Sequence, residues 1–180
     1  MMKNFQFSIF NFQKRLKTEG FTIVESLVAI TILILAITGV TSAIQTGISS
    51  YIFSKDQVIA FYLAQEGFEQ IRNIRDENGL KNQNWLTGLD PCFSSDGCYV
   101  DVVSGGVPIT CPVGTCPVLK QDVATSFFGY NSGWPDTIFK RKITLTQINN
   151  DEVSLLVTVN WSKGVVLRQF KVRESLLNWQ

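Results

Sequence analysis

The feature that most constrains this chain is a long apolar segment without charge: no Asp, Glu, Lys or Arg occurs between Glu25 and Lys55. A helix needs about 20 apolar residues to cross the hydrocarbon core of a bilayer. The densest apolar stretch, residues 23–43, reaches about 30 Å at a helical rise of ~1.5 Å per residue. Uncharged runs of this length are unusual in the core helices of soluble proteins, so the segment predicts a single membrane-spanning helix.

The residues ahead of this segment predict its orientation. Four basic residues and one acidic residue precede it, namely Lys3, Lys14, Arg15, Lys17 and Glu19. Excess positive charge beside a first membrane helix favours retention of that end in the cytoplasm. We therefore expect residues 1–20 to act as a leader. The rest of the chain would be the extracytoplasmic part of a single-pass protein of the cell (inner) membrane.

Two cleavage sites fit such a leader. An ordinary secretory signal would be cut behind the small residues Thr41-Ser42-Ala43, which leaves a soluble chain starting at Ile44. The apolar region is, however, longer than the ~7–15 residues usual for such signals. The other site precedes the apolar region, between Gly20 and Phe21. Gly has no Cβ, so its backbone can approach a protease closely.

The residues around Gly20 resemble the leader of type IV prepilins and pseudopilins. In that family a Gly precedes an apolar residue, and a Glu is the fifth residue of the mature chain; Gly20, Phe21 and Glu25 match this pattern. The resemblance implies that a prepilin peptidase cuts between Gly20 and Phe21 and N-methylates Phe21. It also implies that Glu25 pairs with the N-terminal amine of a neighbouring subunit during assembly.

Glu25 also has a simpler interpretation, because a carboxylate in the first helical turn suits the helix dipole. Two departures from the family pattern favour a minor subunit: the leader is long, and no proline occurs between Met1 and Asp90. In addition, residues 63–76 resemble minor prepilins of the pilus-modification type.

The helical pattern continues beyond the membrane segment. The residues of one stripe recur at steps of three or four, at Val58, Phe61, Ala64 or Gln65, Phe68, Ile71 and Ile74. This spacing predicts an amphipathic helix whose apolar stripe packs on a sheet, and Asn78-Gly79 supplies a stop signal. We therefore expect one N-terminal helix with a transmembrane and assembly half, residues 21–54, and an amphipathic half, residues 55–79.

Residues 80–137 are rich in Gly, Pro, Ser, Asn and Asp, which predicts an irregular loop region with one or two short strands. All four cysteines lie here, at Cys92, Cys98, Cys111 and Cys116. An even number in an exported domain predicts disulfides. The turn-forming residues inside each short interval favour Cys92–Cys98 and Cys111–Cys116, although a crossed pairing stays open. A four-thiolate zinc site is the rival, but its CxxC-like spacing is missing.

From residue 138 the pattern changes to alternation with a period of two. Ile143 and Leu145, and then alternate residues from Val153 to Trp161, stand between more polar neighbours. After a turn at residues 162–164, the apolar residues Val166, Phe170 and Val172 share one parity. This predicts an antiparallel β-meander over residues 138–180, with the chain from Glu174 onward as a tail or helical turn. The buried face of the meander needs a cover, which the amphipathic helix provides. We expect an α+β, type IV pilin-like fold.

The composition offers little for catalysis. The formal net charge is +1 and histidine is absent, which removes the commonest general base and neutral metal ligand. No nucleophile–base pair, phosphate-binding loop, metal-ligand spacing or long basic run stands out. We therefore expect neither an enzyme nor a cofactor, a metal site or a nucleic-acid partner.

The leading interpretation is a structural subunit of an extracellular or periplasmic filament. Its expected partners are a prepilin peptidase, other pilin subunits, an inner-membrane assembly platform and the lipid bilayer. The alternative is a signal-anchored extracytoplasmic binding module that does not polymerise, with residues 80–137 as its binding surface. The filament system stays open between an adhesion or motility pilus, DNA uptake and type II secretion, as does a tip or shaft position.

Overall fold

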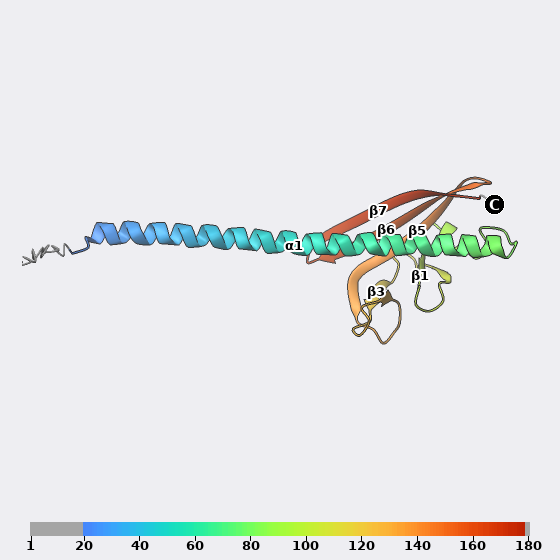
Figure 1. Ribbon diagram of the computed structural model, residues 1–180, viewed down its shortest axis with the longest axis horizontal. Helices are drawn as coiled ribbons and strands as arrows, with labels where there is room; N and C mark the ends of the chain where they lie inside the picture. Colours follow the sequence, from blue (N-terminus) through green and yellow to red (C-terminus); the bar gives the residue numbers. More distant parts are fainter. Residues whose placement is uncertain (1–19, 179–180) are drawn as a thin grey trace, which may run out of the picture. The chain divides into compact units, whose positions relative to one another are not determined.

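The computed structural model describes residues 20–178 (Figure 1). The leader expected at residues 1–19 therefore lies outside the described residues, as do the last two positions of the chain. The chain divides into two compact units, Met1–Ser49 and Ser50–Gln180. The second unit contains the sheet and its core.

One helix, α1 (Ile23–Leu80), runs through 58 residues without a break. No proline interrupts it, which removes the commonest cause of a kink. It ends later than the Gly79 stop signal predicts. The residue with positive φ is Asn82, at 52°, and the backbone N–H groups of Asn82 and Gln83 donate to the carbonyls of Gly79 and Asn78. This pair of hydrogen bonds defines a Schellman cap.

Eight further elements follow α1. They are η1 (Asp90–Phe93), β1 (Cys98–Val100), β2 (Pro108–Thr110), β3 (Val118–Gln121), β4 (Phe128–Gly129), β5 (Asp136–Asn149), β6 (Glu152–Lys163) and β7 (Val166–Leu177). The expectation of one or two short strands between the helix and the meander is too low, because β1 to β4 all lie there. These short strands form because β5 offers them an edge: β1 and β3 both pair with it.

Strands β5, β6 and β7 form the expected antiparallel meander, with Ile143 opposite Val157 and Val157 opposite Val172. The expectation of a tail or helical turn from Glu174 is wrong. β7 continues to Leu177, which lies opposite Glu152, and the side chain of Leu176 is buried. Burial of that side chain and the added backbone pairs with β6 favour the strand over a tail.

The core of the second unit lies between α1 and the inner face of the sheet. The buried apolar residues of β5 and β6 are Phe139, Ile143, Leu145, Val153, Leu155, Val157, Val159 and Trp161, the parity that the alternation predicts. On α1 the buried positions are Ala60, Leu63, Ala64, Gly67, Phe68, Ile71 and Asn78. An α+β layout, with an N-terminal helix packed on an antiparallel sheet, is thereby confirmed.

The buried face of α1 differs from the predicted stripe at its beginning. Val58 is 53% exposed and Phe61 is 43% exposed, so neither belongs to the core. Small residues take their place: a Cβ added at Gly67 would lie only 3.3 Å from Val157 Cγ1 and 3.4 Å from Arg141 Cδ. The helix approaches β6 so closely that a glycine fits best at this position.

Candidate functional site

The predicted processing residues lie at the start of α1. Gly20 and Phe21 precede the helix without regular structure, and the side chain of Phe21 is exposed. The Glu25 backbone N–H donates a hydrogen bond of 3.2 Å to Thr22 Oγ1, so Thr22 is the N-cap residue of the helix. The Gly20–Phe21 peptide bond therefore lies in an exposed segment directly ahead of a capped helix.

Glu25 occupies the third helical position, where a carboxylate interacts favourably with the helix dipole. Its side chain is exposed, and among residues 20–178 its carboxylate has no hydrogen-bond or ion-pair partner. Both interpretations of Glu25 at the sequence level are compatible with this geometry, because the dipole favours the charge and leaves the carboxylate oxygens free for a further partner.

Sequence reasoning missed the role of Thr22. The signal was present, because a Thr followed by Glu three residues later and then by an apolar run is the pattern of a capping box. The cap explains why the helix begins at Ile23 and not within the preceding residues.

Within the described part of the first unit, residues 20–49, no other segment covers the apolar part of α1. None of the side chains in its most apolar 18-residue stretch is buried, and this one helix is long and apolar enough to cross a membrane. Ile23 is 86% exposed and Leu35 is 71% exposed. Such a surface is unfavourable in water and is stable only against lipid or other apolar chains.

The hydroxyl groups of this segment are satisfied by the helix itself. Thr31 Oγ1 donates to the Val28 carbonyl at 2.8 Å, and Thr41 Oγ1 donates to the Ile37 carbonyl at the same distance. Thr38 and Thr46 donate in the same way to preceding carbonyls. Because an unpaired hydroxyl is costly in a hydrocarbon environment, these bonds suit a helix that lies in lipid.

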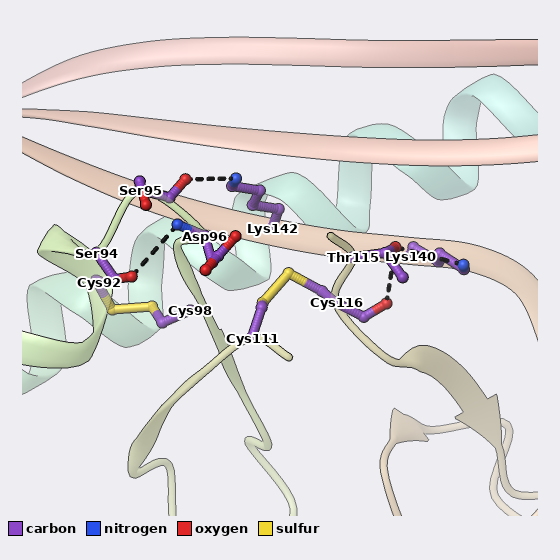
Figure 2. The surroundings of a disulfide bond; sticks show 10 residues. All are labelled: Cys92, Ser94, Ser95, Asp96, Cys98, Cys111, Thr115, Cys116, Lys140 and Lys142. Atoms are coloured by element: carbon purple, nitrogen blue, oxygen red, sulfur yellow. Dashed lines mark hydrogen bonds between the residues drawn. A yellow bond between two sulfur atoms is a disulfide. The ribbon is translucent and has the colours of Figure 1, made fainter. Parts of the chain in front are cut away.

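The four cysteines belong to the second unit and form two disulfides, Cys92–Cys98 and Cys111–Cys116, with Cα atoms 4.5 Å and 4.6 Å apart (Figure 2). This is the local pairing that the turn residues favour over a crossed one. No thiolate remains among the four to bind zinc. The two bridges are neighbours, because the Cys111 N–H donates to the Gly97 carbonyl at 2.9 Å.

The first disulfide loop is held against the sheet. Gly97 has a φ of +69°, and a Cβ there would lie 2.6 Å from the Ile143 carbonyl oxygen of β5, so the close approach requires a glycine. Lys142 Nζ donates to the Ser95 carbonyl at 3.0 Å (Figure 2). The loop is thus a structural attachment to β5.

A charged side chain that the sequence analysis missed lies in the core. Arg141 is 1% exposed on the inward face of β5 and donates to the carbonyls of Leu63 at 3.0 Å and Val100 at 2.9 Å. It also forms an ion pair with Glu66 of α1. Arg141 therefore joins the helix, the sheet and β1. The alternation of the strand could have indicated this burial, because Arg141 occupies the position between Phe139 and Ile143 on the inward face.

Tyr130 is the other unusual buried group. Its hydroxyl is buried without a hydrogen-bond partner among the described residues, and burial raises its pKa to about 12. The phenol is therefore uncharged at neutral pH. Within residues 20–178 there is also no cluster of three or more His, Cys, Asp or Glu residues arranged to hold a metal ion.

The chain matches no protein-family model, and comparisons with curated proteins and with solved structures find no similar protein.

Proposed function

We propose that this chain is a minor type IV pilin or pseudopilin, a non-catalytic subunit that is cut by prepilin peptidase and assembled into a filament. The single observation that carries this proposal is the exposed apolar half of α1, which begins at a capped N-terminus beside an exposed Gly20–Phe21 bond. The same helix continues without a break into the part that supports the sheet. If the apolar half of α1 is kept after maturation, the sheet domain stays attached to its anchor by one continuous helix.

The chemistry of assembly follows from the environment of Glu25. A carboxylate inside a bilayer costs ~2.5–3.5 kcal/mol at the centre of a helix and less near the interface. Removal of the leader would create an amine at Phe21, one helical turn away in sequence and able to pair with Glu25 of an adjacent copy. That pairing would align neighbouring apolar helices at the inner-membrane assembly platform. Apolar contacts with lipid would then be exchanged for contacts between helices at little hydrophobic cost.

The mass of the N-terminal peptide of the mature protein tests the processing step. We expect a peptide that starts at an N-methylated Phe21. A peptide that starts at Met1 contradicts the proposal and favours the anchored module that does not polymerise. A peptide that starts at Ile44 indicates an ordinary secretory signal.

Two substitutions test the assembly step. Glu25→Gln and Glu25→Ala should be cut and anchored normally but should be at least about ten-fold depleted from sheared filaments, since a desolvated ion pair is lost. Asp56→Asn is the matched control, because Asp56 is the first acidic residue beyond the apolar segment. Normal incorporation of both Glu25 variants would refute the assembly role.

A further inference from the structure

The tip of the β6–β7 hairpin exposes three consecutive apolar side chains, one in the turn and two at the start of β7. Val165 is 99% exposed, Leu167 is 82% exposed and Val166 is 50% exposed. The turn itself needs only Gly164, whose φ is +61°. Short polar residues are the usual choice in a solvated turn, so the turn geometry does not require the aliphatic side chain of Val165. An exposed apolar cluster of this kind indicates a contact surface.

The place of this tip in the second unit is defined by contacts with α1. The Arg168 guanidinium carbon lies 4.0 Å from the centre of the Phe53 ring, and the ring of Phe170 packs edge-on against Phe61 at a centroid distance of 6.0 Å. Further along, Arg72 forms an ion pair with Glu174. β7 thus follows α1 in the same direction. The first residues of β7 therefore lie beside the helical turn that contains Phe53, and Figure 1 shows the start of β7 alongside α1.

Phe53 stands at the end of the uncharged segment, because Lys55 is the first charged residue after Glu25. The segment spans about 43 Å at a rise of ~1.5 Å per residue. This length matches a bilayer of about 40–45 Å including its headgroup regions. When the segment crosses a membrane, its last residues therefore reach the level of the outer headgroups. Phe53 is one of these residues, so the hairpin tip beside Phe53 is connected to the helix within reach of the lipid surface.

The charges near the tip complement an anionic surface. Lys163 and Arg168 stand on either side of the apolar residues, and no acidic residue occurs from Lys163 to Arg173. Basic side chains near an anionic membrane each strengthen binding, while apolar side chains enter the boundary between headgroups and acyl chains. The turn between β3 and β4 also exposes apolar residues, Val123 and Phe127, but it carries Asp122 and fits an anionic surface less well.

We propose that the β6–β7 tip, residues 163–168, is a second membrane contact that docks on the lipid surface beside the helix. Val165 and Leu167 enter the headgroup–acyl boundary, and Lys163 and Arg168 interact with lipid phosphates. The contact would hold the second unit at the membrane until the helix is extracted. This inference rests on the membrane-anchored helix of the proposed function and does not require filament assembly.

The test places an environment-sensitive fluorophore at the tip of the full-length chain, by Val165→Cys or Leu167→Cys with the two native disulfides kept intact. The protein is reconstituted in vesicles of phosphatidylcholine and phosphatidylglycerol that carry a quencher on the acyl chains. We expect blue-shifted, quenched emission at both tip positions. Ile148→Cys is the matched control, because Ile148 is an exposed aliphatic residue near the opposite end of the meander; its emission should stay that of a label in water.

A separate experiment tests the role of charge in this contact. Adding Lys163→Gln to the labelled chain should weaken the lipid-contacting state roughly five-fold, the effect of removing one basic charge near an anionic surface. Vesicles of phosphatidylcholine alone should weaken it further. Equal emission in the two kinds of vesicle would overturn the assignment of an anionic surface.

Flotation of the vesicles measures the anchor separately. A chain that does not float contradicts the membrane helix and with it both proposals. A chain that floats while the tip labels remain in water overturns the hairpin contact alone. A tip label that is shielded from water but escapes the lipid-borne quencher lies against a second copy of the chain, which also overturns the proposal.

Discussion

At the scale of single residues, Arg141 has the most demanding environment in the second unit. A buried guanidinium is tolerated only when its charge and its donors are matched, and here Glu66 supplies the charge while the Leu63 and Val100 carbonyls accept two donors. Its Nε atom is buried without a partner among the described residues. Two of the three partners lie on α1 and the third on β1, so Arg141 connects β5 to two elements that are distant from it in sequence.

Loss of the Arg141 contacts should lower the stability of the second unit. We expect Arg141→Ala to lower the free energy of unfolding by about 3–5 kcal/mol, because it strands Glu66 and two carbonyls. Glu66→Gln keeps an acceptor on a side chain that is one-third exposed and should cost only about 1–2 kcal/mol. Urea-induced unfolding of the protein in mild detergent measures both. Equal losses of unfolding free energy in Arg141→Ala and Glu66→Gln would contradict the expectation that removal of the arginine costs more.

Tyr130 should make stability depend on alkaline pH. An unfolded tyrosine has a pKa near 10, whereas burial raises the pKa of Tyr130 to about 12. Between these values the unfolded chain loses the proton that the folded chain retains, so stability falls as pH rises, by about 3 kcal/mol in total.

We therefore expect Tyr130→Phe to lose less stability than the parent protein between pH 9 and pH 11.5, and to be no less stable at pH 7 because an unpaired buried hydroxyl is removed. Urea-induced unfolding at these pH values provides the measurement. Tyr62→Phe is the control, since Tyr62 is 63% exposed. An identical pH dependence in the parent protein and in Tyr130→Phe would show that the phenol is not responsible.

At the scale of elements, the contact between α1 and β6 depends on the size of the facing side chains as well as on their apolar character. The helix presents Ala60, Ala64 and Gly67 to the sheet, and these small residues allow close approach to β6. The larger residues Val58 and Phe61 lie outside the core. A period of 3.6 residues predicts that an apolar stripe exists. It does not choose between two neighbouring stripes, because that choice depends on which one fits the surface of the sheet.

The contact at Gly67 is testable with a matched pair of substitutions. Gly67→Leu places a large side chain where even a Cβ is crowded by Val157, and it should destabilise the second unit by about 1–3 kcal/mol. Gly79→Leu is the control, because a Cβ at Gly79 meets nothing within 4 Å. The control should be neutral or stabilising by up to ~1 kcal/mol, since leucine is the better helix former. Thermal unfolding followed by near-ultraviolet circular dichroism compares them.

At the scale of the whole chain, the two units have different requirements. The first unit contains an apolar helix with no cover of its own, whereas Ser50–Gln180 contains a core and both disulfides. Burial of a core is what allows a segment to fold without help from its neighbours. The division therefore separates an apolar helical segment of membrane-spanning length from a unit that contains its own core.

This division predicts the behaviour of a truncated chain. Residues 50–180, produced in an oxidising compartment, should be soluble and monomeric without detergent and should contain two disulfides. The full chain should aggregate unless detergent or lipid covers its helix. Size-exclusion chromatography, circular dichroism and the mass difference on reduction provide the measurements. An unfolded or aggregated fragment would show that the sheet depends on the first unit.

Local properties of the sequence determined the membrane-length helix, the continuity of α1 past residue 54, the alternation of the meander and the short cysteine intervals that suit local bridges. Each of these depends on residues that are near one another in the chain, where composition and period act directly. The tertiary structure alone decided where the buried stripe of α1 begins, that Arg141 lies inside and that four short strands form before β5. It also decided that β7 continues to Leu177 and that the β6–β7 tip lies beside Phe53. All of these depend on register between distant segments, which is selected by the fit of whole surfaces and leaves only a faint trace in local sequence.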